Sequence, residues 1–325
     1  MTTYKGLRGL TIRTVAGDPS VLAAGDIWYD SVAKKVQGAK LAAGAWASGG
    51  TLNTNQRAMN AGFGLQTAAI CVGGILSSGG TTAVVEKYDG TSWTEVGDIN
   101  TARGTFAGGG GTSSSAVVAG GTPNLAICES WDNSSWTEVA DLNTGRVSAG
   151  SCGTSNTAAL IFGGAVSPNY LTITELWNGT AWTEVADLST ARSHHAGAGT
   201  TTAALAATGY DPKTVNVENY NGTAWTEVGN VNTARYNLGG GGTSTSAVIF
   251  GGNTPSIVGS TEQYDGSSWT EVANLATAGN DFGTGDSGDS GELAIAISGS
   301  PPVGGGTGGT EEWTVAASVE TVAVD

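Results

Sequence analysis

Five near-identical segments of eighteen residues constrain the fold of this chain more than any other feature. They occupy residues 86–103, 129–146, 175–192, 218–235 and 262–279, and the first reads EKYDGTSWTEVGDINTAR. The tryptophan within them recurs at residues 93, 136, 182, 225 and 269, with a further copy at 46, so the spacings are 47, 43, 46, 43 and 44 residues. A fixed period of this length indicates an array of similar supersecondary units.

Each unit divides into four strand-like pieces. An apolar run such as residues 68–72 ends in Gly-Gly, and an Asp-Gly or Asn-Gly pair then separates two aromatic residues, such as Tyr88 and Trp93. That pattern predicts a tight hairpin whose rings pair across the strands. The polar-alternating run after the tryptophan predicts the outermost strand. Glycine makes up 53 of 325 residues, because innermost strands that converge on an axis leave room only for the smallest side chains.

The number of strands predicts an all-β, six-bladed propeller over residues 45–317, with 318–325 as a C-terminal tail. Six copies of the first three strands are present, but no second tryptophan follows Trp313, so the last unit lacks an outer strand. The strand around Trp46 is in excess at the start of the array. We therefore expect it to pair with the Trp313 strand and close the propeller without an open edge.

The unit resembles the kelch repeat over residues 46–315, which implies a β-propeller. The resemblance rests on the aromatic pair and on a strand-ending Gly-Gly at residues 73–74, 120–121, 163–164 and 251–252. It also rests on an arginine after the crossover to the next blade, at Arg103, Arg146, Arg192 and Arg235. The chain departs from the pattern at Gln56 and Gly279, which stand at the arginine position, and at AATG in residues 206–209.

Charged residues that recur in every unit are predicted to be structural. A glutamate stands two residues before the first aromatic, at Glu86, Glu129, Glu175, Glu218, Glu262 and Glu311. Together with the arginines it is interpreted as a fastener between blades, because six identical active sites are improbable. A second series, Glu95, Glu138, Glu184, Glu227 and Glu271, lies on the outer strands and is expected to face water.

Residues 1–44 lie outside the repeat and differ from it in charge. Residues 1–45 contain six basic and three acidic residues, a net charge of +3, whereas residues 46–325 contain 7 basic and 25 acidic residues, a net charge of −18. Such a break indicates two modules. Residues 25–38, GDIWYDSVAKKVQG, predict a β-hairpin. Its residues Trp28, Tyr29, Lys34 and Lys35 are the candidate attachment residues.

A second resemblance concerns the origin of the chain. The opening, TYKGLRGLTIRTVAGDPSVLAAGDIWYDSVAKKVQG, is similar to openings of virion and tail-fibre proteins of tailed bacteriophages. The repeat DGTSWTEV…NTAR resembles kelch-like proteins of marine phages, including cyanophages. This implies a non-enzymatic structural protein of the virion, assembled in the host cytoplasm as a tail fibre, appendage or capsid decoration. Residues 1–44 would contact other virion proteins, and the propeller would serve host attachment.

The candidate binding face lies where the units differ from one another, because loops on a rigid scaffold usually carry recognition. The residues just after each crossover vary, and they are Met59, Asn60, Thr105, Phe106, Ser148, His194, His195, Tyr236, Asn237, Asp281 and Phe282. Aromatic rings beside amide and carboxylate groups suit either a host-surface glycan or a host protein. A glycan-binding adhesin is therefore an alternative function, and homo-oligomerisation is left open.

An enzyme acting on glycans is the less favoured alternative, because chemistry at the axis of a propeller needs converging acid, base or metal ligands. The only histidines are the neighbours His194 and His195, which are interpreted as a partly exposed loop pair. Residues 285–292, GDSGDSGE, are compatible with a cation site but equally form ordinary turns. No catalytic residue, cofactor or bound metal is expected. Cys71, Cys128 and Cys152 are expected to be buried thiols.

Charge and hydropathy exclude further classes of partner. The net charge of −15 disfavours nucleic-acid binding, because a polyanion is repelled by an acidic protein. No apolar run is long enough to cross a bilayer, and no signal-peptide pattern opens the sequence. Neither membrane insertion nor secretion by a signal peptide is therefore expected.

Overall fold

The chain folds into two compact units made of β-strands. The computed structural model describes residues 12–19, 26–54, 57–210, 212–285, 291–300 and 308–322. The first unit combines residues 1–44 with 315–325, and the second comprises Ala45–Thr314. No helix occurs among the described residues. The described part of the chain therefore contains no helix that could span a membrane.

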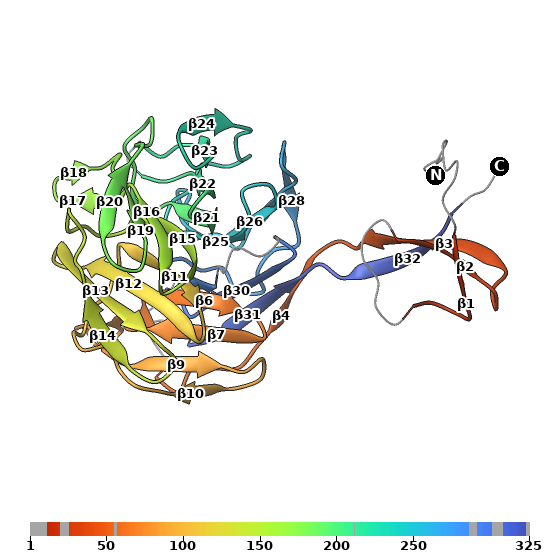
Figure 1. The fold of residues 1–325 in the computed structure, drawn as a ribbon, viewed down its shortest axis with the longest axis horizontal. Coiled ribbons are helices and arrows are strands. Elements are labelled where there is room, and N and C mark those ends of the chain that lie inside the picture. Colours follow the sequence, from red (N-terminus) through yellow and green to blue (C-terminus); the bar gives the residue numbers. More distant parts are fainter. Residues whose placement is uncertain are drawn as a thin grey trace. The chain divides into compact units, whose positions relative to one another are not determined.

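The second unit contains six four-stranded sheets within the described residues (Figure 1). The first sheet consists of β6 (Ala61–Leu65), β7 (Ala68–Val72), β9 (Val85–Tyr88) and β10 (Trp93–Glu95). The second consists of β11 (Gly108–Thr112), β12 (Ser115–Gly121), β13 (Leu125–Trp131) and β14 (Trp136–Val139). The third consists of β15 (Gly150–Ser155), β16 (Ala158–Phe162), β19 (Thr174–Trp177) and β20 (Trp182–Val185).

The remaining sheets repeat this order with one exception. The fourth consists of β21 (Ala196–Thr200), β22 (Ala203–Ala207), β23 (Val217–Tyr220) and β24 (Trp225–Val228). The fifth consists of β25 (Gly239–Gly242), β26 (Ala247–Phe250), β27 (Thr261–Tyr264) and β28 (Trp269–Val272). The sixth consists of β29 (Gly283–Gly285), β30 (Leu293–Ile297), β31 (Thr310–Thr314) and β4 (Ala45–Ser48). Two short pairs flank them: β5 (Arg57–Ala58) with β8 (Ile75–Leu76), and β17 (Ala165–Val166) with β18 (Asn169–Tyr170).

The exception is the outer strand of the sixth sheet, which comes from the start of the array. Trp46 of β4 lies opposite Trp313 of β31, and the two strands are antiparallel. The predicted pairing of these two tryptophans is therefore confirmed. The Trp46 ring also contacts Phe250 of the fifth sheet, with ring centroids 4.8 Å apart, and its Nε1–H donates to Thr261 Oγ1 at 3.0 Å.

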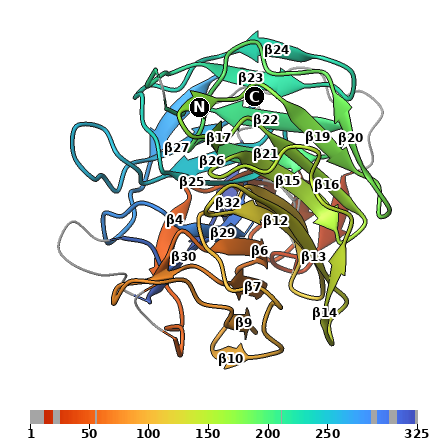
Figure 2. The ribbon, with the colours of Figure 1, turned by 90° about the vertical axis from the view of Figure 1, so that its left-hand side faces the viewer.

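The sheets are arranged in a propeller-like manner. Figure 2 shows the strands of the first sheet running outward from β6 near the centre to β10 at the rim. Successive inner strands contact one another in the order β6, β11, β15, β21, β25 and β29, and β29 in turn contacts β6. The spacing between inner strands is set by glycine: a Cβ on Gly110 would lie 2.7 Å from the Cα of Gly153 in the next sheet. The predicted reason for the glycine content is thus confirmed at this position.

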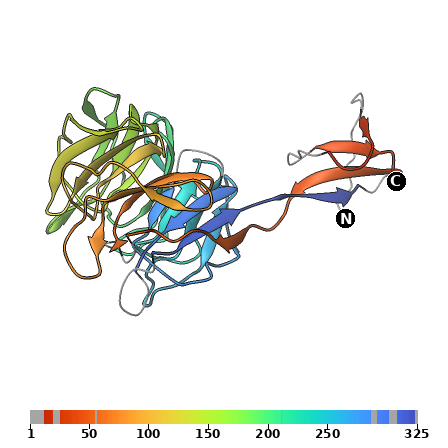
Figure 3. The same ribbon diagram turned by 90° about the horizontal axis from the view of Figure 1, so that it is seen from below.

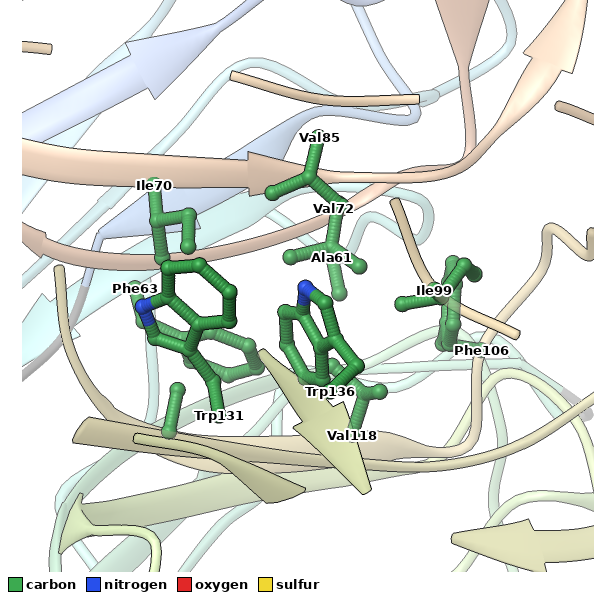
Figure 4. Packing of buried hydrophobic residues seen from close by; sticks show 11 residues of the cluster. Ala61, Phe63, Ile70, Val72, Val85, Ile99, Phe106, Val118, Trp131 and Trp136 are labelled. Carbon is green, nitrogen blue, oxygen red and sulfur yellow. The ribbon is translucent and has the colours of Figure 1, made fainter. Parts of the chain in front are cut away.

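Apolar side chains fill the space between neighbouring sheets. Figure 4 shows one such core, in which Phe63 and Ile70 of the first sheet pack with Val118 and Trp131 of the second. These side chains are at least 96 % buried, and burying each stabilises the fold by about 1.5–3 kcal/mol. The three cysteines are buried free thiols within such cores, as predicted.

Each outer hairpin is held by its aromatic pair. In all six sheets the two rings lie directly opposite each other, with centroids 4.9–5.5 Å apart. In the first sheet Asp89 Oδ1 accepts hydrogen bonds from the N–H groups of Thr91 and Ser92, and Gly90 has a φ of 92°. Gly90 of the Asp-Gly pair therefore adopts the left-handed backbone within the predicted tight hairpin. The second glutamate series on the outer strands is exposed, as predicted.

The repeated arginines and glutamates form buried ion pairs. Each glutamate also accepts hydrogen bonds from the N–H groups of the crossover that leads into its own sheet, as Glu129 does from Asn100 at 2.6 Å. The pairs are Arg57–Glu86, Arg103–Glu129, Arg146–Glu175, Arg192–Glu218 and Arg235–Glu262. The assignment of Gln56 to the arginine position was wrong, because the first crossover is one residue longer and Arg57 occupies that position.

The first unit is a four-stranded sheet in the order β1 (Arg13–Val15), β2 (Ile27–Asp30), β3 (Lys35–Leu41) and β32 (Ala317–Thr321). β2 and β3 form the predicted hairpin. The prediction of a tail after residue 317 differs from the structure, in which β32 pairs along β3 from Ala317 to Thr321 (Figure 3). This strand carries no repeat signal, and its partner lies at the other end of the sequence.

Candidate functional site

The six residues that follow the crossovers form a hydrogen-bonded ring in the second unit, in which the N–H of Ser148 donates to the carbonyl of Phe106. Each has a left-handed backbone: Met59, Thr105, Ser148, His194, Asn237 and Asp281 have φ values of 53°, 51°, 52°, 54°, 56° and 55°. Each N–H donates to a carbonyl of the preceding sheet, for example His194 to Ser148 at 2.7 Å and Asn237 to His194 at 2.9 Å. The N–H of Met59 donates to Asp281, so the last sheet is linked to the first.

A cavity of about 150 Å³ opens at this ring. We call it the ring cavity. Its walls include one residue of the hydrogen-bonded ring from every sheet, and also Phe63 and inner-strand glycines such as Gly109 and Gly240. A cavity of about 150 Å³ holds a molecule the size of one benzene ring. The residues that vary between the units therefore meet at a site for one small ring-shaped group.

Buried polar atoms in the wall of the ring cavity are left without partners. Asn60 is 7 % exposed, and neither its Oδ1 nor its Nδ2 has a hydrogen-bond partner among the described residues. The Oδ1 of Asn237 is likewise unpartnered within the described chain. The Asn60 side chain lies against Gly283, where a Cβ would come within 1.8 Å of Oδ1. An unsatisfied buried amide is costly to the folded state.

The two histidines of the site are kept neutral by burial. Desolvation lowers the pKa of His194, and it lowers the pKa of His195 well below the ordinary value. His195 is 5 % exposed, its Nε2 accepts a hydrogen bond from the N–H of Gly150 at 3.1 Å, and its ring packs on Phe162. The interpretation of this residue as partly exposed was therefore wrong. His194 is half-buried, and its Nδ1 lies 2.7 Å from Ser193 Oγ.

The predicted binding residues are brought together with one exception. Asn60, Thr105, Phe106, Ser148, His194, His195, Asn237, Asp281 and Phe282 all line the ring cavity. Tyr236 does not, because its backbone pairs with Asn253 and its ring contacts Tyr210 at a centroid distance of 5.0 Å. Tyr210 in turn contacts Tyr170 at 6.0 Å, so the three tyrosines form a row that the sequence did not reveal.

The candidate attachment residues divide into one core residue and three surface residues. Trp28 is 2 % exposed, so its side chain is buried and does not lie on the surface of the first unit. Tyr29 is 36 % exposed, and Lys34 and Lys35 are exposed at the turn between β2 and β3. The alternation along β2 explains the difference, since successive side chains point to opposite faces of a sheet.

The proposed cation loop falls mostly outside the described residues. Asp286 and Asp289 are not among them, and Glu292 is half-buried. Within the described part of the chain, no group of three or more histidine, cysteine or acidic side chains is placed to hold a metal ion.

Asp281 should make stability depend on pH. Burial raises its pKa from 3.8 to about 6. A raised pKa means that the folded state binds the proton more tightly, so the contribution is complete below about pH 4 and is lost as the pH rises through 6. Asp281→Asn, whose side chain suits the left-handed backbone, should therefore be more stable than the wild type at pH 8, by up to about 3 kcal/mol.

Urea denaturation at pH 4 and pH 8 measures this effect. The advantage of Asp281→Asn should shrink toward pH 4, where the wild-type carboxyl is protonated. The same change at exposed Asp89, Asp89→Asn, is the control and should not produce a gain at pH 8. An Asp281→Asn variant with the same advantage at both pH values would contradict the assignment.

Comparison with known proteins adds no family assignment: no protein-family model matches the chain, and no curated protein matches it.

Proposed function

We propose that the chain is a non-enzymatic structural protein of a bacteriophage virion, which displays a closed six-bladed kelch-like propeller for recognition at the ring cavity. The recognition role is supported by a difference between the recurring and the varying residues of the repeat. Those that recur form the hairpins and the buried ion pairs, whereas those that vary meet at one cavity. A scaffold that keeps its framework and varies one site is typical of a binding module.

Three observations support the closed six-bladed arrangement. The second unit has six four-stranded sheets within the described residues, and β4 supplies the outer strand that the sixth sheet would otherwise lack. The inner strands contact one another in an unbroken cycle. The hydrogen-bonded ring also returns from Asp281 to Met59.

The virion assignment rests on the two sequence resemblances and on the character of the first unit. Tyr29, Lys34 and Lys35 give this unit an exposed aromatic residue and an exposed basic turn, whereas residues 45–314 of the second unit carry a net charge of −16. A basic turn on one unit and an acidic second unit suit a chain that binds different partners through the two units.

Attachment is tested by reversing the charge of this turn. Lys34→Glu/Lys35→Glu should abolish co-sedimentation with phage particles that lack the protein, because complementary charges guide docking. Lys213→Glu is the matched control, since Lys213 is exposed in the second unit, and it should co-sediment normally. Unchanged co-sedimentation of the double variant would remove the first unit as the anchor.

For the ligand, the ring cavity favours a single sugar ring of a host-surface glycan. Its wall offers amides from Asn60 and Asn237 and hydroxyls from Thr105 and Ser148, and its histidines are neutral. Such groups match the hydroxyls of an uncharged sugar, and they are positioned by rigid strands and turns.

Asn60→Ala separates binding from folding. Because the wild-type amide is buried without a partner, removing it should leave the free energy of unfolding unchanged or raise it by about 1 kcal/mol. The variant should nevertheless lose binding on a glycan array to which the wild type binds. An array that detects no wild-type binding, or equal binding by the variant, would contradict the glycan assignment.

A further inference from the structure

The sixth sheet contains a cavity at the place where the other five sheets hold an arginine. Gly279 stands at the arginine position and lines a cavity of about 260 Å³, which we call the sixth-sheet cavity. In the other sheets this position is filled by the buried side chains of Arg57, Arg103, Arg146, Arg192 and Arg235. The cavity therefore lies where an arginine side chain would lie if the sixth sheet followed the repeat.

The third sheet shows which groups hold the guanidinium when the arginine is present. Nη1 of Arg146 donates to the carbonyls of Gly163 at 3.1 Å and Ile173 at 2.8 Å, while Nη2 pairs with Glu175. In the fourth sheet Arg192 repeats this arrangement, with Nη2 2.6 Å from Glu218 Oε1. Two carbonyls and one carboxylate thus accept hydrogen bonds from the planar guanidinium group.

The sixth sheet keeps the equivalents of all three groups. The N–H of Ser298 donates to the carbonyl of Gly309, as the N–H of Gly163 does to that of Ile173. Ser298 also shares the left-handed backbone of Gly163, with φ values of 57° and 64°. Ser298, Gly309 and Glu311 all line the sixth-sheet cavity.

Glu311 occupies the position of the paired glutamates but, among the described residues, has no cation beside it. It lies opposite Ala296 in the sheet register, as Glu175 lies opposite Ile161. It accepts hydrogen bonds from the crossover N–H groups of Ala276 at 2.7 Å and Thr277 at 3.0 Å. Among the described residues, no basic side chain forms an ion pair with it.

We propose that the sixth-sheet cavity binds a guanidinium group supplied from outside the chain, either an arginine side chain of a partner protein or a free small molecule. Equivalent carbonyls and an equivalent glutamate hold the guanidinium in the third and fourth sheets, so the acceptors that line this cavity fit the same group. Phe282 lines the cavity, and its counterpart Phe106 lies under Arg103 with the guanidinium carbon 5.3 Å from the ring centroid. An aromatic face favours a cation at this place. The proposal is independent of the function of the ring cavity.

Calorimetric titration with ethylguanidinium tests the proposal on the whole chain. The wild type should bind one equivalent, and ethylammonium of equal charge should bind about tenfold more weakly, because it lacks the planar fork. Glu311→Gln should weaken ethylguanidinium binding at least about tenfold. Glu271→Gln is the matched control, because this carboxylate is exposed on β28, and its binding should equal that of the wild type.

Gly279→Arg should fill the cavity from within. A Cβ on Gly279 would lie 2.8 Å from Cζ of Phe282, so the ring must turn aside, as the coexistence of Arg103 and Phe106 in the second sheet allows. The variant should melt at a higher temperature than the wild type and should no longer bind ethylguanidinium. Binding that persists unchanged in both Gly279→Arg and Glu311→Gln, or no saturable binding by the wild type, would overturn the proposal.

The reciprocal variant, Arg146→Gly, should open a second cavity of the same kind in the third sheet. It should bind a second equivalent of ethylguanidinium and recover melting temperature as the ligand is added. If it does not fold, the two sixth-sheet variants still decide the question. Titration with the peptide Gly-Arg-Gly and with free L-arginine distinguishes the sources: tighter binding of the peptide supports an arginine side chain of a partner, and tighter binding of the amino acid supports a free small molecule.

Discussion

Replacing Arg192 by methionine should lower the free energy of unfolding by about 3–5 kcal/mol, because it leaves the carboxylate of Glu218 buried without a cation. The two side chains are 1 % exposed, and the arginine also donates to the carbonyls of Thr208 and Asn216. Methionine has a similar volume and fits the space, so the loss reports the broken ion pair and the lost hydrogen bonds rather than a cavity. Urea denaturation followed by tryptophan fluorescence measures it.

Two further variants show whether the unpaired charge is the cause. Arg192→Met/Glu218→Gln should recover part of the loss, since a glutamine oxygen still accepts from the N–H of Ser189 and carries no charge. Glu227→Gln on the exposed face of β24 should change stability by less than about 0.5 kcal/mol. A double variant less stable than Arg192→Met alone would show that the carboxylate stabilises the crossover even without its arginine.

Removing β4 should have a still larger effect, because the sixth sheet would lose its outer strand. A chain of residues 45–314 should fold and unfold cooperatively, since it retains every strand of the second unit. A chain of residues 49–314 loses the Trp46 ring and the ladder to β31. Deleting a large aromatic side chain alone costs about 3–5 kcal/mol, so the shorter chain should be destabilised by more than that.

A peptide of residues 41–52 should restore the shorter chain in trans. Addition of a strand to an open sheet edge provides backbone hydrogen bonds and a pocket for an aromatic side chain. The same peptide with Trp46→Ser is the control and should not raise the melting temperature. Equal melting temperatures for the chains 45–314 and 49–314 would mean that β4 contributes little to the second unit.

Much of the second unit follows from the sequence because the repeat presents the same evidence several times. The facing tryptophans of β4 and β31 were predicted by counting strands, although these strands lie at opposite ends of the array. The position of Arg57 was not found, because one extra residue in the first crossover shifts the register. The pairing of β32 with β3 was also missed, since neither strand carries a periodic signal that identifies its partner.

The sequence predicted which residues line the ring cavity but not the backbone conformation that forms it. Variation after each crossover identified residues such as Asn60 and Asn237. The left-handed backbone of the ring, however, is not evident from residues such as Met59, Thr105 or Ser148. These residue types seldom adopt that conformation. It is held here by hydrogen bonds from one sheet to the next, which are long-range interactions that no local pattern encodes.

The pairing of β4 with β31 has a consequence for synthesis of the chain on the ribosome. β4 emerges before any other strand of the second unit, whereas its partner emerges after all the others. During most of translation β4 is therefore an unpaired strand bearing an exposed tryptophan, and the growing array has an open edge. Two nascent chains that meet at this stage can exchange β4, each completing the sixth sheet of the other. Polysomes that hold many copies close together would then yield domain-swapped dimers. In such a dimer every strand has its native pairing, but each β4 comes from the other chain.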